Sequence, residues 1–248
     1  MVCTGVLTGL LLFSLSSSVV SADRVDLNTL HRIIQVFESR YKPGEDLQYA
    51  VAINVPAEQC KENFNKDNFL SEYTDNVKDD LKKKRLYIGN HMVAARPKGG
   101  GSTAIHSERA LLICEDQAVT PVQNLLNTAD RNGCVVFYTY NSPCLDYCLN
   151  QKNDNDQQNR ERAQKERGKT DVTPAVKKCI LDSLSILTNH PGPKAFVFSQ
   201  VYRKDRENTN LASALKEVAE KVPLYRCNTN RCIECLDNNK KFNNQCLS

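Results

Sequence analysis

The stretch that decides the fold is CVVFYTYNSPCLDYC, residues 134–148. Residues 134–140 form a near-continuous apolar and aromatic run, which is typical of a central strand buried on both faces. A Ser-Pro-Cys segment follows directly, and a second cysteine comes four residues after the first. The sequence therefore places two sulfur atoms immediately beyond a buried strand.

The segments on either side alternate between strand and helix periodicity. The predicted strands are residues 49–55, 87–95, 134–140, 195–201 and 224–227. The predicted helices are residues 30–37, a helix capped by Ser102 or Thr103 and reaching about Gln117, residues 173–187 and residues 211–222. A helix between the last two strands makes them a parallel pair. The expected fold class is α/β, with one mixed five-stranded sheet covered by helices on both faces.

Length and composition limit the class of protein. The chain has 248 residues, of which 25% are charged and 40% hydrophobic, so it is neither disordered nor fibrous. Its net charge of +4 is too small to indicate a nucleic-acid binder by itself. This length allows one domain of ordinary size or two small ones.

The amino-terminal residues have the features of a secretory signal. Val6 to Phe13 is apolar, and Val20-Ser21-Ala22 has the small side chains that a signal peptidase reads. The sequence predicts cleavage after Ala22 and secretion of the mature chain. The alternative is a membrane anchor, although the apolar run is shorter than the ~20 residues that a bilayer needs. No other segment indicates a membrane span, so we expect no membrane contact after cleavage.

Three parts follow from these patterns: a signal peptide at residues 1–22, a main domain at residues 23–227 and a Cys-rich tail at residues 228–248. Within the main domain, residues 150–170 lack apolar periodicity and are rich in Asn, Gln, Asp, Arg and Lys. We expect this stretch to be a polar surface insertion rather than a boundary between domains.

The cysteine count also points to an oxidising compartment. Of eleven cysteines, Cys3 is lost with the signal, and ten remain. Eight of them lie outside the pair at 144 and 148 and are available for disulfides, whose pairing the sequence does not fix. A second zinc site is the alternative for the last four, Cys227, Cys232, Cys235 and Cys246.

One further motif completes a candidate metal site. His106-Ser107-Glu108 lies near the start of a predicted helix, after the Gly-rich loop. One His and two Cys suffice as protein ligands of a catalytic zinc, and a nearby glutamate can carry protons without being a ligand. The alternative in a secreted protein is a disulfide between Cys144 and Cys148.

Together the two motifs resemble the zinc signature of the cytidine deaminase superfamily, in which His-x-Glu is followed by Ser-Pro-Cys and a second cysteine. The order of strands and helices around Phe198 to Tyr202 is similar to that of the AID/APOBEC branch. With the secretory signal, the chain resembles the secreted novel AID/APOBEC-like deaminases of fishes. The resemblance implies a three-layer α/β/α cytidine deaminase-like fold.

The resemblance also implies roles for individual residues. His106, Cys144 and Cys148 would hold one zinc ion per chain, and Glu108 would be the general acid and base. The backbone of Ser142 would face the exocyclic amine of the base. Three residues separate the two cysteines, one more than in the usual signature.

The branch often has Trp before Ser-Pro-Cys, whereas this chain has Asn141 and no Trp. Tyr140 or Tyr202 would then supply the aromatic wall of the pocket. A basic cluster after the fourth strand would bind phosphates of the substrate without reading sequence. It comprises Arg203, Lys204 and Arg206.

We therefore expect a secreted, zinc-dependent hydrolytic deaminase that converts cytosine to uracil in single-stranded DNA or RNA, in extracellular or immune defence. Two alternatives stay open. One is an inactive binding or immune effector protein on the same fold, and the other is an enzyme acting on free cytidine.

Overall fold

A computed structural model describes residues 24–61, 64–67, 69–99, 104–113, 119–155 and 178–248. Its centre is a seven-stranded sheet in the order β2-β3-β1-β4-β5-β6-β7. The strands are β1 (Ala50–Val55), β2 (Leu86–Ile88), β3 (Met92–Ala95), β4 (Cys134–Asn141), β5 (Lys194–Gln200), β6 (Leu224–Cys227) and β7 (Cys232–Glu234).

The sheet is mixed. β1 pairs antiparallel with β3 and β4, whereas β4, β5 and β6 run parallel to one another. The expected parallel pairing of residues 195–201 with residues 224–227 is confirmed. The expected count of five strands is wrong, because two further strands are present.

Each extra strand comes from a short reversal. Residues 87–95 were expected to form one strand, but the chain turns between β2 and β3, where the Gly89 N–H donates to the Met92 carbonyl. In the tail, β7 folds back antiparallel on β6, and the Asn228 N–H donates to the Arg231 carbonyl in that turn. Gly89-Asn90 and the Asn228–Arg231 stretch are rich in turn-forming residues, which favour these reversals.

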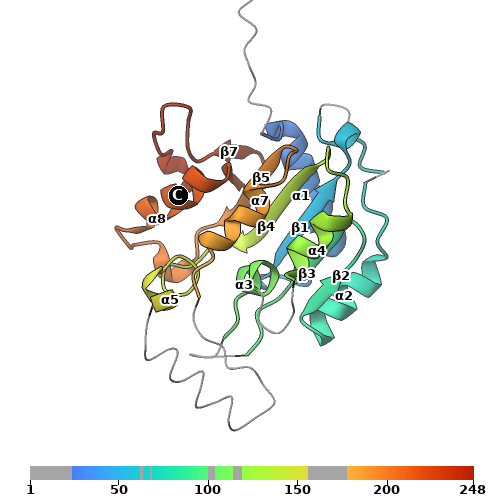
Figure 1. Ribbon diagram of the computed structural model, residues 1–248, viewed down its shortest axis with the longest axis horizontal. Helices are drawn as coiled ribbons and strands as arrows, with labels where there is room; N and C mark the ends of the chain where they lie inside the picture. Colours follow the sequence, from blue (N-terminus) through green and yellow to red (C-terminus); the bar gives the residue numbers. More distant parts are fainter. Residues whose placement is uncertain (1–23, 62–63, 68, 100–103, 114–118, 156–177) are drawn as a thin grey trace, which may run out of the picture.

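Helices cover both faces of the sheet (Figure 1). The longest of the described helices, α1 (Leu27–Tyr41), lies behind the sheet in this view and packs with α2 (Thr74–Lys83) in one apolar core. The other core holds residues of α3 (Ser107–Leu112), α4 (Pro121–Thr128), α7 (Ser185–Thr188) and α8 (Leu211–Lys221). The short α5 (Lys152–Asn155) follows the second motif. The three layers agree with the expected arrangement.

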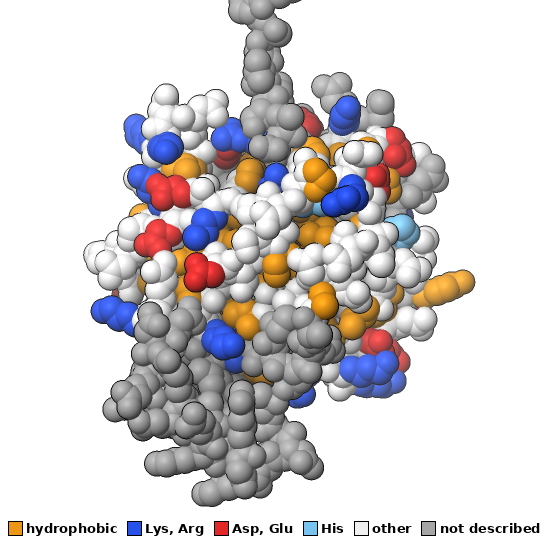
Figure 2. Space-filling model, viewed as in Figure 1, with side chains coloured by type: hydrophobic (Ala, Val, Ile, Leu, Met, Phe, Trp, Pro, Cys, Tyr) orange, Lys and Arg blue, Asp and Glu red, His pale blue; other side chains and the backbone are white. Residues whose placement is uncertain are grey.

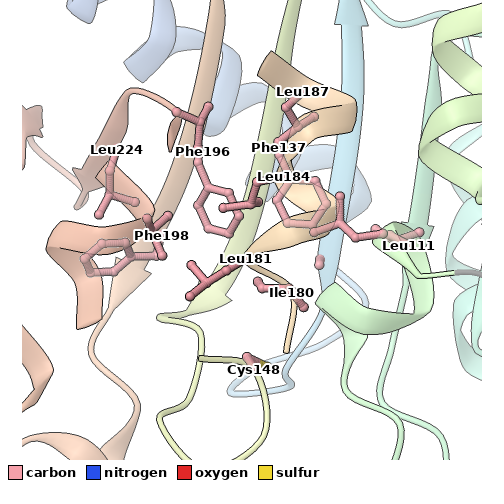
Figure 3. Close-up of a cluster of buried hydrophobic side chains, with 14 of the residues drawn as sticks. Leu111, Phe137, Cys148, Ile180, Leu181, Leu184, Leu187, Phe196, Phe198 and Leu224 are labelled. Carbon is pink, nitrogen blue, oxygen red and sulfur yellow. The ribbon is translucent and has the colours of Figure 1, made fainter. Parts of the chain in front are cut away.

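Figure 3 shows how the core that contains α3, α4, α7 and α8 packs against the sheet. Phe137 of β4 and Phe196 of β5 lie side by side, with ring centroids 4.9 Å apart, beneath Leu184 and Leu187. All four side chains are buried completely. Full burial of such a side chain stabilises the fold by about 1.5–3 kcal/mol before entropic costs.

Two expected helices differ from the structure. The helix after the Gly-rich loop begins at Ser107, with His106 as its N-cap, and ends at Leu112. Backbone hydrogen bonds between Lys98 and Ile105 keep the chain extended until just before this point. The expected cap residues 102 and 103 lie outside the described residues, as does the start of the helix expected at 173–187. Its described part comprises a 3₁₀ turn (Asp182–Leu184) and α7.

Three disulfides join described cysteines: Cys60–Cys134, Cys227–Cys232 and Cys235–Cys246. The four cysteines of the tail region are thus paired in disulfides and do not form a second zinc site. Cys144 and Cys148 are not bonded to each other, so the alternative of a disulfide between them is wrong for this structure.

Residues 1–22 and most of the polar stretch 150–170 lie outside the described residues. Among the helices that are described, none is long and apolar enough to cross a membrane.

The disulfides differ in the length of chain that they close, which gives a test of their contribution. Cys60 and Cys134 are 74 residues apart, whereas Cys227 and Cys232 are five apart. By the chain-entropy relation, the first restricts the unfolded chain by about 4–5 kcal/mol and the second by about 2 kcal/mol. We expect Cys60→Ala/Cys134→Ala to lower the free energy of unfolding clearly more than Cys227→Ala/Cys232→Ala in chemical denaturation. Equal losses would contradict this assignment.

Candidate metal centre

The first motif is held at the start of α3. His106 is the N-cap residue and keeps an extended backbone, while Ser107 and Glu108 form the first turn of the helix. Ser107 and Glu108 are both buried in this first turn. The first motif therefore lies at a helix start, as expected.

The second motif lies on a single turn rather than at the start of a helix. The N–H groups of Cys148 and Leu149 both donate to the Cys144 carbonyl, which closes the turn. The Asp205 carboxylate accepts a hydrogen bond of 3.0 Å from the Leu145 N–H. Beyond the turn, the Cys148 carbonyl accepts from the Ile180 N–H, which ties it to the core beside Ile180 and Leu181 (Figure 3).

The two motifs meet at three donor atoms. His106 Nδ1 lies 3.4 Å from Cys144 Sγ and 3.6 Å from Cys148 Sγ, and the two sulfurs are 3.8 Å apart. Both cysteines are buried and His106 is half-buried. These three residues are the group among the described residues that could hold a metal ion.

The surroundings of the two sulfurs shift their pKa values in opposite directions. The hydrogen bond from Cys148 and the contact with His106 outweigh burial and together lower the pKa of Cys144 to about 4. The same hydrogen bond, together with burial, raises the pKa of Cys148 well above its usual value. Burial alone would lower the pKa of His106, but the Cys144 hydrogen bond and charge outweigh it and raise that pKa. The surroundings of Cys144 therefore favour the thiolate, the form that binds metals.

Glu108 lies beside this group and is almost completely buried, with 1% of its surface exposed. Its Oε1 accepts hydrogen bonds from Thr139 Oγ1 at 2.6 Å and Gln48 Nε2 at 3.0 Å, and its Oε2 accepts one from Ser107 Oγ at 3.1 Å. Burial raises the pKa of Glu108, while His106 and Thr139 oppose the rise. Burial thus favours the protonated form of the Glu108 carboxyl group, whereas its hydrogen bonds and His106 favour the carboxylate.

A cavity of about 290 Å³ opens beside the three potential metal ligands. His106, Cys144, Tyr147, Tyr202 and Lys204 are among the residues that line it. The Tyr147 ring stacks on the His106 ring, with centroids 4.7 Å apart. Tyr202 was expected to supply an aromatic wall, and the structure places it in this lining.

Tyr140 lies on the other side of β4. It stacks on Tyr49 at 5.8 Å between ring centroids and lines a separate cavity next to α1 with Lys42. Successive side chains of a strand point to opposite faces, so Tyr140 shares a face with Tyr138 rather than with Thr139. It therefore does not supply the wall beside His106.

The remaining predicted residues lie around the site but are not among the three potential metal ligands. Ser142 is buried, its N–H donates to the Gln200 carbonyl, and its Oγ accepts from the Tyr202 N–H. Arg203, Lys204 and Arg206 are exposed, and the residue between them, Asp205, is buried. In Figure 2, lysines and arginines are interspersed with acidic side chains over the described part of the face in view.

Sequence reasoning missed four residues of the site: Gln48, Thr139, Tyr147 and Asp205. The alternation of β4 would have placed Thr139 on the same face as Phe137. Tyr147 lies inside the second motif, next to Cys148, where its contact with the site could have been anticipated. Gln48 comes from a loop and Asp205 from the 3₁₀ turn Arg203–Asp205, both far from the two motifs in the sequence. No pattern marks Gln48, and Asp205 stands out only as the acidic residue within the basic cluster.

Comparison with protein families assigns the chain. The family model described as Secreted Novel AID/APOBEC-like Deaminase 1 matches residues 27–165 and 160–248. This chain belongs to that family. The match includes both motifs and extends through the disulfide-bonded tail. No curated protein and no solved structure matches the chain.

The buried carboxylate of Asp205 gives a test of how the cysteine turn is held. Asp205→Ala leaves the Leu145 N–H without its acceptor, so we expect the free energy of unfolding to fall by about 1–3 kcal/mol. The exposed Asp146 lies in the same turn, and Asp146→Ala should change stability by less than about 0.5 kcal/mol. Denaturant unfolding of both variants measures the difference, and similar values would contradict the role of Asp205.

Proposed function

We propose that this chain is a secreted, zinc-dependent hydrolytic deaminase that converts cytosine to uracil in single-stranded nucleic acid. The observation that carries the proposal is the group formed by His106, Cys144 and Cys148 next to the buried carboxylate of Glu108. Membership of an AID/APOBEC-like deaminase family supports the same reaction class.

The spacing of the donor atoms supports zinc. Tetrahedral zinc with Zn–S of about 2.3 Å and Zn–N of about 2.0–2.1 Å implies S···S near ~3.8 Å and S···N near ~3.6 Å. The three separations here are 3.8, 3.6 and 3.4 Å. Three protein ligands leave a fourth position open, as in catalytic rather than structural zinc sites. When bound, zinc would supply a water molecule acidic enough to react at neutral pH.

The chain's own residues would then bind the base and move protons. Glu108 would take one proton from the attacking water and pass it to the ring nitrogen, and would then take the second proton from the hydroxyl now on the base and pass it to the departing amine. Tyr147 and Tyr202 offer apolar ring surface at the cavity beside His106. Burial of Glu108 excludes bulk water from the carboxylate and strengthens its interactions with the reacting groups.

Two features favour a polynucleotide over a free nucleoside as substrate. The basic side chains Arg203, Lys204 and Arg206 are exposed directly after β5, and Lys204 also lines the cavity. Phosphates of nucleotides flanking the target base can bind there while the base enters the cavity. The parallel pairing of β5 and β6 is, by resemblance, the arrangement of the polynucleotide-acting branches.

We also propose secretion with signal cleavage after Ala22, and a role in extracellular or immune defence. The family name describes its members as secreted. Three disulfides are the pattern expected of a protein that folds in an oxidising compartment.

Replacement of Glu108 tests the reaction. We expect chain purified from a secretory host to contain one zinc per chain and to form uracil in a cytosine-containing oligonucleotide. Glu108→Ala should keep the zinc and lower the rate by about 100-fold or more, because it removes the proton carrier. The exposed Glu217 of α8 provides a control, and Glu217→Ala should keep full activity. Equal activity of wild type and Glu108→Ala would reject the mechanism, and zinc-loaded wild type without activity would favour an inactive binding protein.

Removal of two cations tests the substrate class. Arg203→Ala/Arg206→Ala removes two exposed cations that do not line the cavity, and should weaken oligonucleotide binding and reduce the slope of log K against log salt by about 0.7 for each phosphate that the variant no longer neutralises. The rate on free cytidine should stay the same. Lys82→Ala/Lys83→Ala removes the same charge from α2, away from the cavity, and serves as the control. Equal reduction of activity on cytidine and on the oligonucleotide would point to a free-nucleoside enzyme.

A further inference from the structure

A chain of side-chain amides leads from β5 to the candidate proton carrier. Gln200 Nε2 donates to Asn141 Oδ1 at 2.8 Å, and Asn141 Nδ2 donates to Gln48 Oε1 at 2.7 Å. Gln48 Nε2 then donates to Glu108 Oε1 at 3.0 Å. Hydrogen bonds thus connect three residues from separate parts of the sequence in series, and the last of these bonds is accepted by Glu108 Oε1.

The direction of this chain is fixed by a backbone group. The Asn141 N–H can only donate, and it donates to Gln48 Oε1 at 3.0 Å. The oxygen of the Gln48 amide therefore faces Asn141, and its nitrogen faces Glu108. The backbone of β4 therefore fixes the orientation of the Gln48 amide, so that its N–H group points toward the Glu108 carboxylate.

The two oxygens of Glu108 are consequently unlike. Oε1 accepts from both Gln48 and Thr139, so its two lone pairs are used. One side chain donates to Oε2, the neighbouring Ser107 hydroxyl, and the Glu108 backbone N–H also donates to the carboxylate. The side chains around Glu108 therefore hold Oε1 with two hydrogen bonds and Oε2 with one.

We propose that Gln48 is a positioning residue, held by Asn141, that fixes the orientation of the Glu108 carboxylate for deamination. The inference rests on the proposed function for its catalytic part. It gives Asn141, which stands where related enzymes often have Trp, the task of anchoring Gln48 instead of contacting the base. The aromatic contact then falls to Tyr147 and Tyr202.

The test combines an equilibrium measurement with kinetics on the full zinc-loaded chain. Gln48→Met keeps the length of the side chain and removes both hydrogen-bonding groups. Because a hydrogen bond to a charged acceptor is stronger than one to a neutral acceptor, we expect Gln48→Met to lower Tm by several degrees in the wild-type chain. The drop should be clearly smaller in a Glu108→Gln background. Gln35→Met on α1, a matched substitution away from the site, should give the same Tm change in both backgrounds.

The kinetic arm separates positioning from binding. We expect Gln48→Met to lower kcat by about tenfold or more with little change in KM, because a misplaced carboxylate affects the reaction more than substrate binding. Zinc content should stay at one per chain. Asn141→Leu should lower kcat in the same way, and should add little when Gln48 is already Met.

The outcomes distinguish this inference from the proposed function. Additive Tm changes in Gln48→Met and Glu108→Gln would overturn the role of Gln48, whatever the activity. Unchanged kcat in Gln48→Met, with an active wild type, would also overturn it. Non-additive Tm changes in a chain that deaminates no substrate would overturn the proposed function and leave the contact of Gln48 with Glu108 established.

Discussion

The alternation of side chains along β4 is the constraint on which the rest of the molecule depends. β4 is central, paired antiparallel with β1 and parallel with β5. Tyr138 and Tyr140 therefore face α1, whereas Phe137 and Thr139 face the other core. A slip of one residue would exchange the two sets, so the packing of both cores fixes the register. The same register brings Thr139 to within 2.6 Å of Glu108.

β4 also positions the segments of chain that are attached to its two ends. Cys134, its first residue, is joined to Cys60 just after β1. Beyond its last residue, Asn141, the chain turns directly into the segment that carries Cys144 and Cys148. Cys144, the first of the two potential cysteine ligands, therefore comes three residues after β4. This strand is paired with β1 and β5 and is linked by a disulfide at its first residue. Preorganisation of this kind keeps donor atoms at fixed separations without a cost at the moment of binding.

The α/β class and the parallel pair could be predicted from the sequence, because both depend on local periodicity. The first helix was predicted only over residues 30–37, whereas it spans Leu27–Tyr41. The meeting of the two motifs was expected from the resemblance to the zinc signature. The sequence did not predict the β2–β3 hairpin, since a Gly-Asn turn within a short apolar stretch is easily taken for one strand. The choice between Tyr140 and Tyr202 for the aromatic wall could have been made from the sequence, because strand parity alone assigns Tyr140 to the face of Tyr138. Gln48 was beyond reach: it lies in a loop 60 residues before Glu108, and only the folded chain brings the two together.

Disulfides and a group of potential metal ligands can coexist in one chain because geometry separates them. The paired cysteines Cys60 and Cys134 are brought together by the sheet, and those of the tail by tight turns. Cys144 and Cys148 lie on one closed turn with His106 Nδ1 within 3.6 Å of both sulfurs. A thiolate there is reactive, and a cation held by all three donors would lower that reactivity while using the same charge. A disulfide between Cys144 and Cys148 would use both sulfurs and leave His106 without its two contacts. A metal ion would use all three donors, and this additional bond favours metal binding over oxidation.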